Sequence, residues 1–155
     1  MKIVIVGVKG QLGTDCVKVF SGKHEVIGCD IPQIDIGDRE SVEQFITPLK
    51  PDVIINCAAF TAVDACETQK ELARKINAEG PKYLAQTAEA VGARLVHIST
   101  DYVFSGNKPI PEYYTEEDAV DPLSQYGVTK LEGEQEALKN CSNTLCLRTA
   151  WLYSG

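Results

Sequence analysis

Tyr126 and Lys130 are the two side chains of this sequence whose types and spacing best suit proton transfer. If the surrounding segment QYGVTKLEGE is helical, residues four apart lie one turn apart on one face, about 6 Å along the axis. A phenol with a pKa near 10 is a poor acid–base group at neutral pH, and a neighbouring ammonium favours the phenolate. We therefore expect Lys130 to lower the pKa of Tyr126 toward the working pH. The same spacing is common on solvated helices, so its meaning depends on the rest of the chain.

A glycine-rich turn supplies the second element of a site. The segment GVKGQLG places Gly7, Gly10 and Gly13 directly after the β-branched run 2–6. Small residues let the backbone approach a pyrophosphate, and the next helix directs its free N–H groups and positive dipole end at that charge. The turn therefore predicts a dinucleotide site, with Gln11 and Leu12 among its cofactor-binding residues.

The choice between the two nicotinamide dinucleotides stays open. Asp30 ends the apolar run 24–30, about twenty residues after the glycine turn, where an acid accepts hydrogen bonds from the ribose hydroxyls of NAD. Lys9 acts in the other direction, because a cation inside the turn attracts the 2′-phosphate of NADP. We therefore expect either NADPH or NADH as the cofactor.

Thr100 completes the predicted chemistry. It follows the apolar run 93–99 in the segment STDYVF, and its hydroxyl is a neutral donor for an oxygen that gains negative charge. Together with the dinucleotide site, this predicts hydride transfer from the nicotinamide to a carbonyl carbon. Tyr126 would donate the proton, and the positive charge of the nicotinamide would act with Lys130 to favour its phenolate. Lys130 would also hold the nicotinamide ribose.

The elements that must position these residues alternate along the chain. Helical periodicity fills the stretches between apolar runs, which is typical of parallel strands joined by crossover helices. We therefore expect an α/β fold with a doubly wound parallel sheet, an NAD(P)-binding Rossmann fold, in one domain over residues 1–155. Apolar runs predict five strands, at 2–6, 24–30, 51–59, 93–99 and 143–149. The runs 24–30 and 51–59 are nearly continuous in apolar character, which is typical of parallel strands covered on both faces.

Capping signals predict where several helices begin. Asp38, the Asp64/Glu67 pair and the Asp121–Pro122 pair each precede a helical pattern. Two further features concern the later part of the chain. A long helix with Leu72 and Ile76 on its apolar face is expected to be kinked or divided at Pro81 and to stop at Gly92. The aperiodic stretch 101–121 leaves a carboxyl edge of the sheet, so it is expected to be a functional loop.

Composition excludes several classes of partner. The net charge of −7 and the lack of a basic run argue against nucleic acid. No apolar stretch approaches the roughly 20 residues that span a bilayer, so we expect no membrane partner and a cytoplasmic location. The oligomeric state, a homodimer included, stays open.

Cysteine and histidine usage argues against disulfides and metals. The six cysteines stand apart with no CxxC pair, which favours buried reduced thiols. His24 and His97 are the only histidines, and neither lies beside a cysteine pair, so no metal site is expected.

The order of five segments carries a family resemblance over the whole chain. GxxGQLG, NCAAFTAVDACE, STDYVFSG, YGVTKLEGE and RTAWLYSG follow one another as in the dTDP-4-dehydrorhamnose reductases, which are extended short-chain reductases acting on sugar nucleotides. STDYVFSG is the most specific of them. The resemblance implies NADPH- or NADH-dependent reduction of a dTDP-keto sugar, dTDP-4-dehydro-L-rhamnose, in dTDP-rhamnose synthesis.

The same resemblance assigns roles to individual residues. It implies chemistry at Thr100, Tyr126 and Lys130, and it places the cofactor and the substrate against two further groups. Asp35 and Ile36 would contact the adenine, Ala58, Ala59 and Thr61 would lie beneath the cofactor, and Thr100, Asp101, Tyr102 and Trp151 would lie beside the substrate sugar.

Three readings of the function follow from these residues. A sugar-nucleotide epimerase or dehydratase would share the fold and the Tyr/Lys pair. An NADP-binding regulatory subunit resembling the methionine adenosyltransferase β subunit would need no reductase activity, although the joint presence of Thr100, Tyr126 and Lys130 favours a reductase. Members of the resembled family continue past the matched segment, so we expect residues 1–155 to be the cofactor-binding portion, able to bind dinucleotide without turning over substrate.

Overall fold

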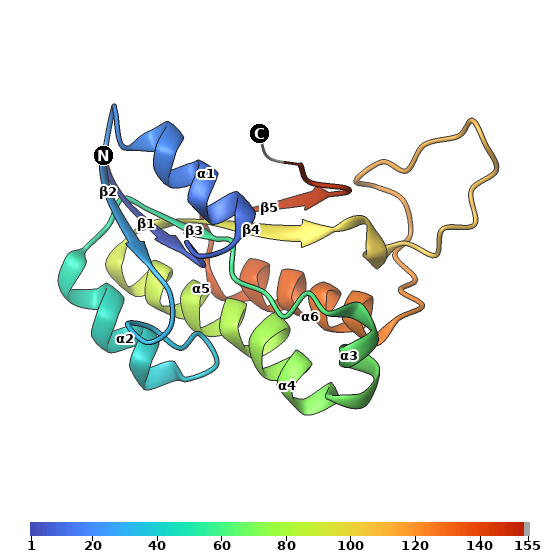
Figure 1. The fold of residues 1–155 in the computed structure, drawn as a ribbon, viewed down its shortest axis with the longest axis horizontal. Coiled ribbons are helices and arrows are strands. Elements are labelled where there is room, and N and C mark those ends of the chain that lie inside the picture. The colour runs from blue at the N-terminus through green and yellow to red at the C-terminus, as the bar shows by residue number, and fades with distance from the viewer. Residues whose placement is uncertain (154–155) are drawn as a thin grey trace.

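A parallel five-stranded sheet forms the centre of the molecule. The computed structural model describes residues 1–153, and the strand order is β2-β1-β3-β4-β5 (Figure 1). The five predicted strands are confirmed, although β3 is shorter than the apolar run around it. Their bounds are β1 Lys2–Val6, β2 Glu25–Cys29, β3 Val53–Asn56, β4 Arg94–Thr100 and β5 Thr144–Thr149.

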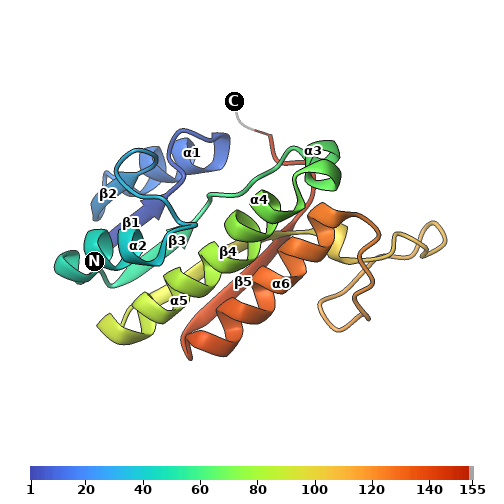
Figure 2. The same ribbon diagram turned by 90° about the horizontal axis from the view of Figure 1, so that it is seen from below.

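Helices flank the sheet on both faces, as expected for a doubly wound α/β fold. Figure 1 shows α1 on one face and the remaining helices on the other, and Figure 2 shows α5 and α6 running side by side beneath the sheet. The bounds are α1 Gln11–Phe20, α2 Arg39–Ile46, α3 Val63–Thr68, α4 Lys70–Arg74, α5 Gly80–Val91 and α6 Gln125–Asn140, with 3₁₀ turns at Thr47–Leu49 and Asp101–Val103 and a π-helical turn at Lys75–Glu79.

The core consists of two clusters, and β1 contributes residues to both. Successive strand side chains point to opposite faces, so Val4 and Val6 pack in the cluster that contains the buried residues of α2 and α5. Ile3 and Ile5 pack in a second cluster together with residues of α1. Burial on both faces is the reason that this strand is apolar throughout.

The strand order creates a crevice at one edge. β1 pairs in parallel with β2 on one side and with β3 on the other. The connections that leave β1 and β3 therefore diverge, and such a switch point is where open α/β sheets bind ligands. This crevice lies between the glycine turn after β1 and the segment that follows β3.

The predicted start of α6 is wrong by a few residues. The helix begins at Gln125 and is capped by Ser124, whose hydroxyl accepts a hydrogen bond from the N–H of Gly127 at 3.0 Å. Asp121 lies outside the helix because its N–H donates to the carbonyl of Val103 at 2.9 Å. This tertiary contact holds the Asp121–Pro122 pair in the preceding loop.

The predicted capping box is also wrong, whereas the Asp38 cap is confirmed. Asp64 and Glu67 lie inside α3, whose first residue follows Ala62 with no side-chain cap. The carboxylate of Glu67 instead accepts from the N–H of Gln125 at 2.7 Å. An acid is favourable there because the first N–H groups of α6 carry the positive end of its dipole. Asp38 accepts from the N–H of Glu40 as predicted.

The expected division of the long helix between β3 and β4 does not fall at Pro81. Helical residues run without a break through α4, the π-helical turn at Lys75–Glu79 and α5, and Pro81 lies just after that turn, as the second residue of α5. Gly92 ends α5 with a positive φ of 76°. Leu72 does not belong to the core: its side chain is 41% exposed and faces the crevice.

Close packing between α6 and the π-helical turn leads to a stability prediction. A Cβ on Gly133 would lie 2.1 Å from the carbonyl oxygen of Asn77, so Gly133→Ala must displace buried backbone. We expect a loss of about 1 to 3 kcal/mol in the free energy of unfolding. Urea unfolding followed by circular dichroism measures it, with Gly22→Ala as control because that Cβ meets nothing within 4 Å. Equal stability of both variants would contradict the packing.

Candidate functional site

A cleft of about 780 Å³ opens at the carboxyl ends of the strands, within the range typical of ligand sites. Every residue predicted for catalysis or binding lies along it, and these residues come from six separate stretches of the chain. The predicted residues in the lining are Gly7, Gly10, Gln11, Leu12, Gly13, Asp30, Asp35, Ile36, Ala58, Ala59, Thr61, Thr100, Asp101, Tyr102, Tyr126, Lys130 and Trp151.

The glycine turn is packed too tightly for side chains at two positions. Gly7 has a φ of +87°, and a Cβ there would lie 2.7 Å from the N of Ala58; a Cβ on Gly13 would lie 2.2 Å from the carbonyl oxygen of Gly7. The N–H groups of Gln11, Leu12 and Gly13 belong to the first turn of α1 and have no acceptor within the helix. They are therefore available to an anion in the cleft.

Asp30 and Asp35 lie on the rim of the cleft and have different local roles. Asp30 accepts from the N–H groups of Lys9 and Ile31, at 3.0 and 2.8 Å, which fixes its carboxylate beside the glycine turn. Asp35 accepts from the N–H of Gly37 at 2.9 Å, so its carboxylate also closes a local turn. Ile36 is 5% exposed and packs in the core, with only part of its surface toward the cleft.

Two buried asparagines hold the loop that follows β3. Asn56 accepts from the N–H of Ala58 at 3.1 Å. The side chain of Asn77 both accepts from the N–H of Phe60, at 2.8 Å, and donates to its carbonyl, at 3.0 Å. Asn77 also donates to the hydroxyl of Thr129 in α6 at 3.2 Å. These bonds fix the small-residue loop relative to the helix that carries Tyr126 and Lys130.

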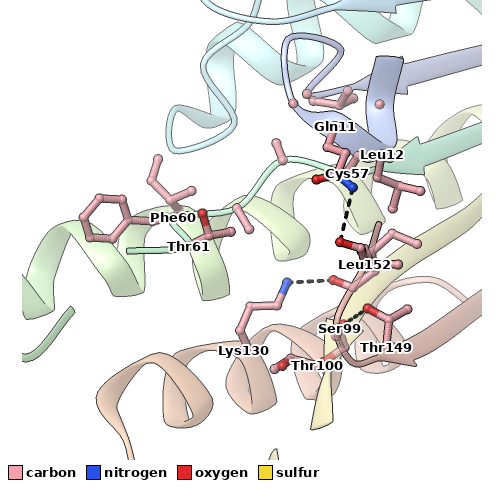
Figure 3. Close-up of a pocket in the computed structure, with 18 of the residues that line it drawn as sticks. Gln11, Leu12, Cys57, Phe60, Thr61, Ser99, Thr100, Lys130, Thr149 and Leu152 are labelled. Atoms are coloured by element: carbon pink, nitrogen blue, oxygen red, sulfur yellow. Dashed lines mark hydrogen bonds between the residues drawn. The ribbon is translucent and has the colours of Figure 1, made fainter. Parts of the chain in front are cut away.

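Lys130 extends its amine into the cleft from a buried position. The side chain is 2% exposed, and its Nζ donates to the carbonyl of Ile98 at 2.6 Å (Figure 3). Burial lowers the pKa of this amine to about 8, while Glu134 acts in the opposite direction. Glu134 is itself held by Arg148 in a two-bond pair at 2.9 and 2.7 Å. Lys130 is therefore mostly a cation at neutral pH.

Tyr126 departs from the expectation that its pKa is lowered. Burial is the largest effect and raises the pKa of the phenol, whereas the neighbouring side chain of Thr100 lowers it. The amine of Lys130 donates to the carbonyl of Ile98. The ring of Tyr102 stands edge-on to that of Tyr126, with centroids 5.6 Å apart. Tyr126 is thus a protonated phenol at neutral pH, the form that can donate a proton.

Thr100 and Asp101 form a compact turn at the end of β4. The hydroxyl of Thr100 accepts from the N–H of Tyr102 and donates to the carboxylate of Asp101, both at 3.2 Å. Thr100 is 6% exposed, so its hydroxyl is oriented by these contacts. The turn brings Thr100, Asp101 and Tyr102 to the end of the cleft where Tyr126 lies.

The last described residues contribute the remaining wall. Trp151 lines the cleft but is 83% exposed. The carbonyl of Leu152 accepts from the amide of Gln11 at 3.2 Å, which joins this segment to the glycine turn (Figure 3). Ser154 and Gly155, the end of the RTAWLYSG segment, lie outside the described residues.

Several residues that line or support the cleft are absent from the sequence-based prediction. Ile34, Phe60 and Leu72 add apolar surface to the cleft, and Ile98 adds the carbonyl that holds Lys130. Apolar residues at the ends of predicted strands and helices carry no signal of their own. Asn77 does carry a signal in the sequence, because an amide within an apolar helical stretch must find buried hydrogen-bond partners.

The remaining features of the structure concern membrane-spanning helices, metal ligands, thiols and histidines. No helix within residues 1–153 is long and apolar enough to cross a membrane. Within the same residues, no group of three or more His, Cys, Asp or Glu side chains is arranged to hold a metal ion. All six cysteines carry free thiols. His97 is fully buried, and its Nδ1 lies 3.1 Å from the amide of Asn56.

The lowered pKa of Lys130 predicts a pH-dependent stability. Between about 8, the native pKa, and 10.5, that of an ordinary lysine, the unfolded chain binds more protons than the native chain. The free energy of unfolding should therefore rise with pH across this window, relative to Lys130→Met, by at most about 1.4 kcal/mol for each pKa unit. Urea titrations of both proteins at several pH values measure the difference. Parallel pH profiles would show that the pKa is not shifted.

Fold and site together define a class: a Rossmann-type α/β domain whose crevice joins a glycine turn to a Tyr/Lys pair on the last helix. Comparison with protein families is more specific. The family model described as RmlD substrate binding domain matches residues 1–155, and the chain belongs to this family.

Individual relatives agree with this assignment. The dTDP-4-dehydrorhamnose reductase of Escherichia coli is 38% identical over 159 residues, covering 100% of this chain and 52% of the relative. A crystal structure of a dTDP-4-dehydrorhamnose reductase from Clostridium acetobutylicum has 52% identity and a TM-score of 0.96, covering 99% of this chain and 54% of that one.

A third relative contains a dinucleotide. The dTDP-4-dehydrorhamnose reductase of Bacillus anthracis, solved in complex with NADP, is 37% identical with a TM-score of 0.94, covering 98% of this chain and 54% of that chain. The chain therefore spans about half the length of the relatives that it matches.

Proposed function

We propose that residues 1–155 are the single cofactor-binding domain of a reductase that converts dTDP-4-dehydro-L-rhamnose to dTDP-L-rhamnose with NADPH or NADH. The observation that carries the proposal is the position of Lys130. A buried ammonium with a carbonyl as its protein partner lies in the same cleft as the free N–H groups of the glycine turn. The family and the reductases named above support the substrate class.

The residues along the cleft suit a dinucleotide from one end to the other. The N–H groups of Gln11, Leu12 and Gly13 would hold the pyrophosphate, and Asp30 would accept from the adenosine ribose. The small residues Ala58 and Ala59 let the backbone pass beneath a flat ligand. At the far end Lys130 would hold the nicotinamide ribose. When bound, the reduced dinucleotide supplies the hydride.

Three side chains would then stabilise the negative charge that develops on the substrate oxygen and supply its proton. The hydroxyl of Thr100 accepts from the N–H of Tyr102 and donates to Asp101 in this structure. On substrate binding it would turn its proton from that carboxylate to the oxygen of the substrate carbonyl. Tyr126 is protonated at neutral pH and would donate its proton to the developing alkoxide. The ammonium of Lys130 would favour the phenolate that remains.

Asp101, Tyr102 and Trp151, which line the cleft, would form its sugar side. Tyr102 and Trp151 are 49% and 83% exposed, so their rings are available for contact with a substrate. We propose these three residues as substrate contacts. A cytoplasmic location is part of the same proposal, since six free thiols fit a reducing compartment.

Two measurements test the proposal. Calorimetric titration with NADH and NADPH tests cofactor binding by the chain itself. Consumption of the reduced dinucleotide with dTDP-4-dehydro-L-rhamnose, followed by absorbance in a protein of the relatives' full length, tests the reaction. An epimerase would change the sugar without net consumption, and a regulatory subunit would bind without turnover, so either result would contradict the reductase assignment.

A further inference from the structure

Glu134 is a buried carboxylate on the helix that carries the Tyr/Lys pair. It follows Lys130 by four residues in α6, so the two side chains lie one turn apart on the same face. Both residues are almost inaccessible to solvent, with exposed fractions of 3% for Glu134 and 2% for Lys130. Lys130 lines the cleft, whereas Glu134 lies behind it. The carboxylate can therefore act on the cleft through Lys130.

Arg148 holds this carboxylate in one position. From β5, its Nε donates to one oxygen of Glu134 at 2.9 Å and its Nη2 donates to the other at 2.7 Å. The guanidinium also lies 5.0 Å from the centroid of the Phe104 ring, which stacks on the ring of Tyr114 with centroids 4.5 Å apart. A two-bond pair whose cation packs on an aromatic ring has little freedom to move. The negative charge of Glu134 is therefore fixed beside Lys130.

Within residues 1–153, the other titratable groups that act on the Lys130 amine are uncharged at neutral pH. They come from three further parts of the sheet: Cys57 after β3, His97 in β4 and Cys146 in β5. Burial raises the pKa of the Cys57 thiol to about 12 and that of the Cys146 thiol to about 11. Burial and the charge of Lys130 lower the pKa of His97, so its imidazole is neutral. Asp101, in the turn after β4, acts on Tyr126 instead.

The buried amine needs an anion that does not occupy its donors. Burial favours the neutral amine, and the carbonyl of Ile98, which accepts from Lys130 at 2.6 Å, carries no full charge. A ribose likewise offers only neutral hydroxyls. Both oxygens of Glu134 are bonded to Arg148, so this carboxylate favours the cation while the remaining N–H groups of the amine stay free for a ligand.

We propose that Glu134, held by Arg148, is a positioning residue that keeps Lys130 cationic in the cleft. The inference rests on the proposed cofactor function, in which that ammonium holds the nicotinamide ribose. It adds to the site a residue that touches neither the dinucleotide nor the substrate and acts only through the charge of its neighbour.

Direct titration of Lys130 tests the effect of this charge without any ligand. The ¹³Cε resonance of the residue, identified by its loss in Lys130→Met, should titrate with the pKa of about 8 in the unmodified chain. Glu134→Gln removes the charge at nearly constant volume, so this pKa should fall by about 1, the low end for loss of a nearby opposite charge. Glu134→Asp keeps the charge and should restore most of the pKa. Glu136→Gln is the matched control, because it removes the same charge from α6 at a residue paired with Lys82.

Calorimetric titration with NADH connects this charge to the cleft. With the pKa of Lys130 lower by about 1, Glu134→Gln should bind NADH up to about 5-fold more weakly than the unmodified chain at a pH of about 8. Near pH 6 the two proteins should bind alike, because Lys130 is cationic in both. A merely structural role of Glu134 would weaken binding equally at every pH, and that result would overturn the inference.

A paired variant guards against loss of the fold. Glu134→Gln leaves Arg148 without its partner, whereas Glu134→Gln combined with Arg148→Met leaves no unpaired buried ion, and the pKa of Lys130 should again fall. An unchanged Lys130 titration in the folded variants, or a fall in Glu134→Asp as large as in Glu134→Gln, would overturn the inference. Failure of the unmodified chain to bind NADH at any pH would overturn the proposed function, while the ¹³Cε titration would still decide whether Glu134 maintains the charge.

Discussion

Replacement of Tyr126 by phenylalanine is expected to lower the rate of carbonyl reduction by about 100- to 10,000-fold, the usual contribution of a general acid. The substitution removes the hydroxyl alone and keeps the ring that packs edge-on against Tyr102. Burial keeps the pKa of this phenol raised, so the lost group is a protonated donor at neutral pH. Dinucleotide binding should change little, because the pyrophosphate and adenosine contacts lie at the other end of the cleft.

The measurement is reduced-dinucleotide consumption with dTDP-4-dehydro-L-rhamnose in a protein of the relatives' full length, with calorimetry on the same variant. Tyr113→Phe serves as the matched control, since Tyr113 is 83% exposed in the loop after β4 and lines no part of the cleft. A Tyr126→Phe enzyme that kept the full rate would show that another group donates the proton.

Substitution of Gly13 by alanine is expected to weaken dinucleotide binding by about 100-fold or more. The new Cβ would lie 2.2 Å from the carbonyl oxygen of Gly7, so the turn must open and its N–H groups lose their common direction. Two charge-assisted hydrogen bonds to pyrophosphate, at about 1.5 to 3 kcal/mol each, account for this magnitude. Calorimetry with NADH and NADPH measures the loss.

Gly22→Ala separates this effect from a general loss of stability, because a Cβ at Gly22 meets no atom within 4 Å. Circular dichroism should show that both variants are folded at the temperature of the titration. If folded Gly13→Ala bound dinucleotide as tightly as Gly22→Ala, the glycine turn would not be the pyrophosphate site.

Strand positions and the residues that follow them were predictable from the sequence for a simple physical reason. Strands buried on both faces must be apolar throughout, as β1 is at Ile3, Val4, Ile5 and Val6. The residues just beyond such runs meet at one edge of a parallel sheet. Gly7, Asp30, Ala58 and Thr100 could therefore be assigned to one site before the fold was known.

Features that depend on contacts between distant segments were not predictable in this way. Ser124 rather than Asp121 caps α6, because Asp121 is held by Val103 in the preceding loop. Asn77 joins the loop after β3 to Thr129, 52 positions along the chain. The raised pKa of Tyr126 likewise reflects burial in the folded molecule, whereas the sequence shows only its spacing from Lys130.

The glycine turn and the last helix are predicted to bind opposite ends of one dinucleotide. Amide ¹H–¹⁵N spectra of the chain during titration with NADH test this most directly. The amides of Gly13 and Lys130 are predicted to shift along one binding curve with NADH, whereas AMP, which has only the adenosine half, should shift Gly13 alone. Shifts at Gly13 with no change anywhere in α6 at saturating NADH would show that the two elements do not bind one dinucleotide together.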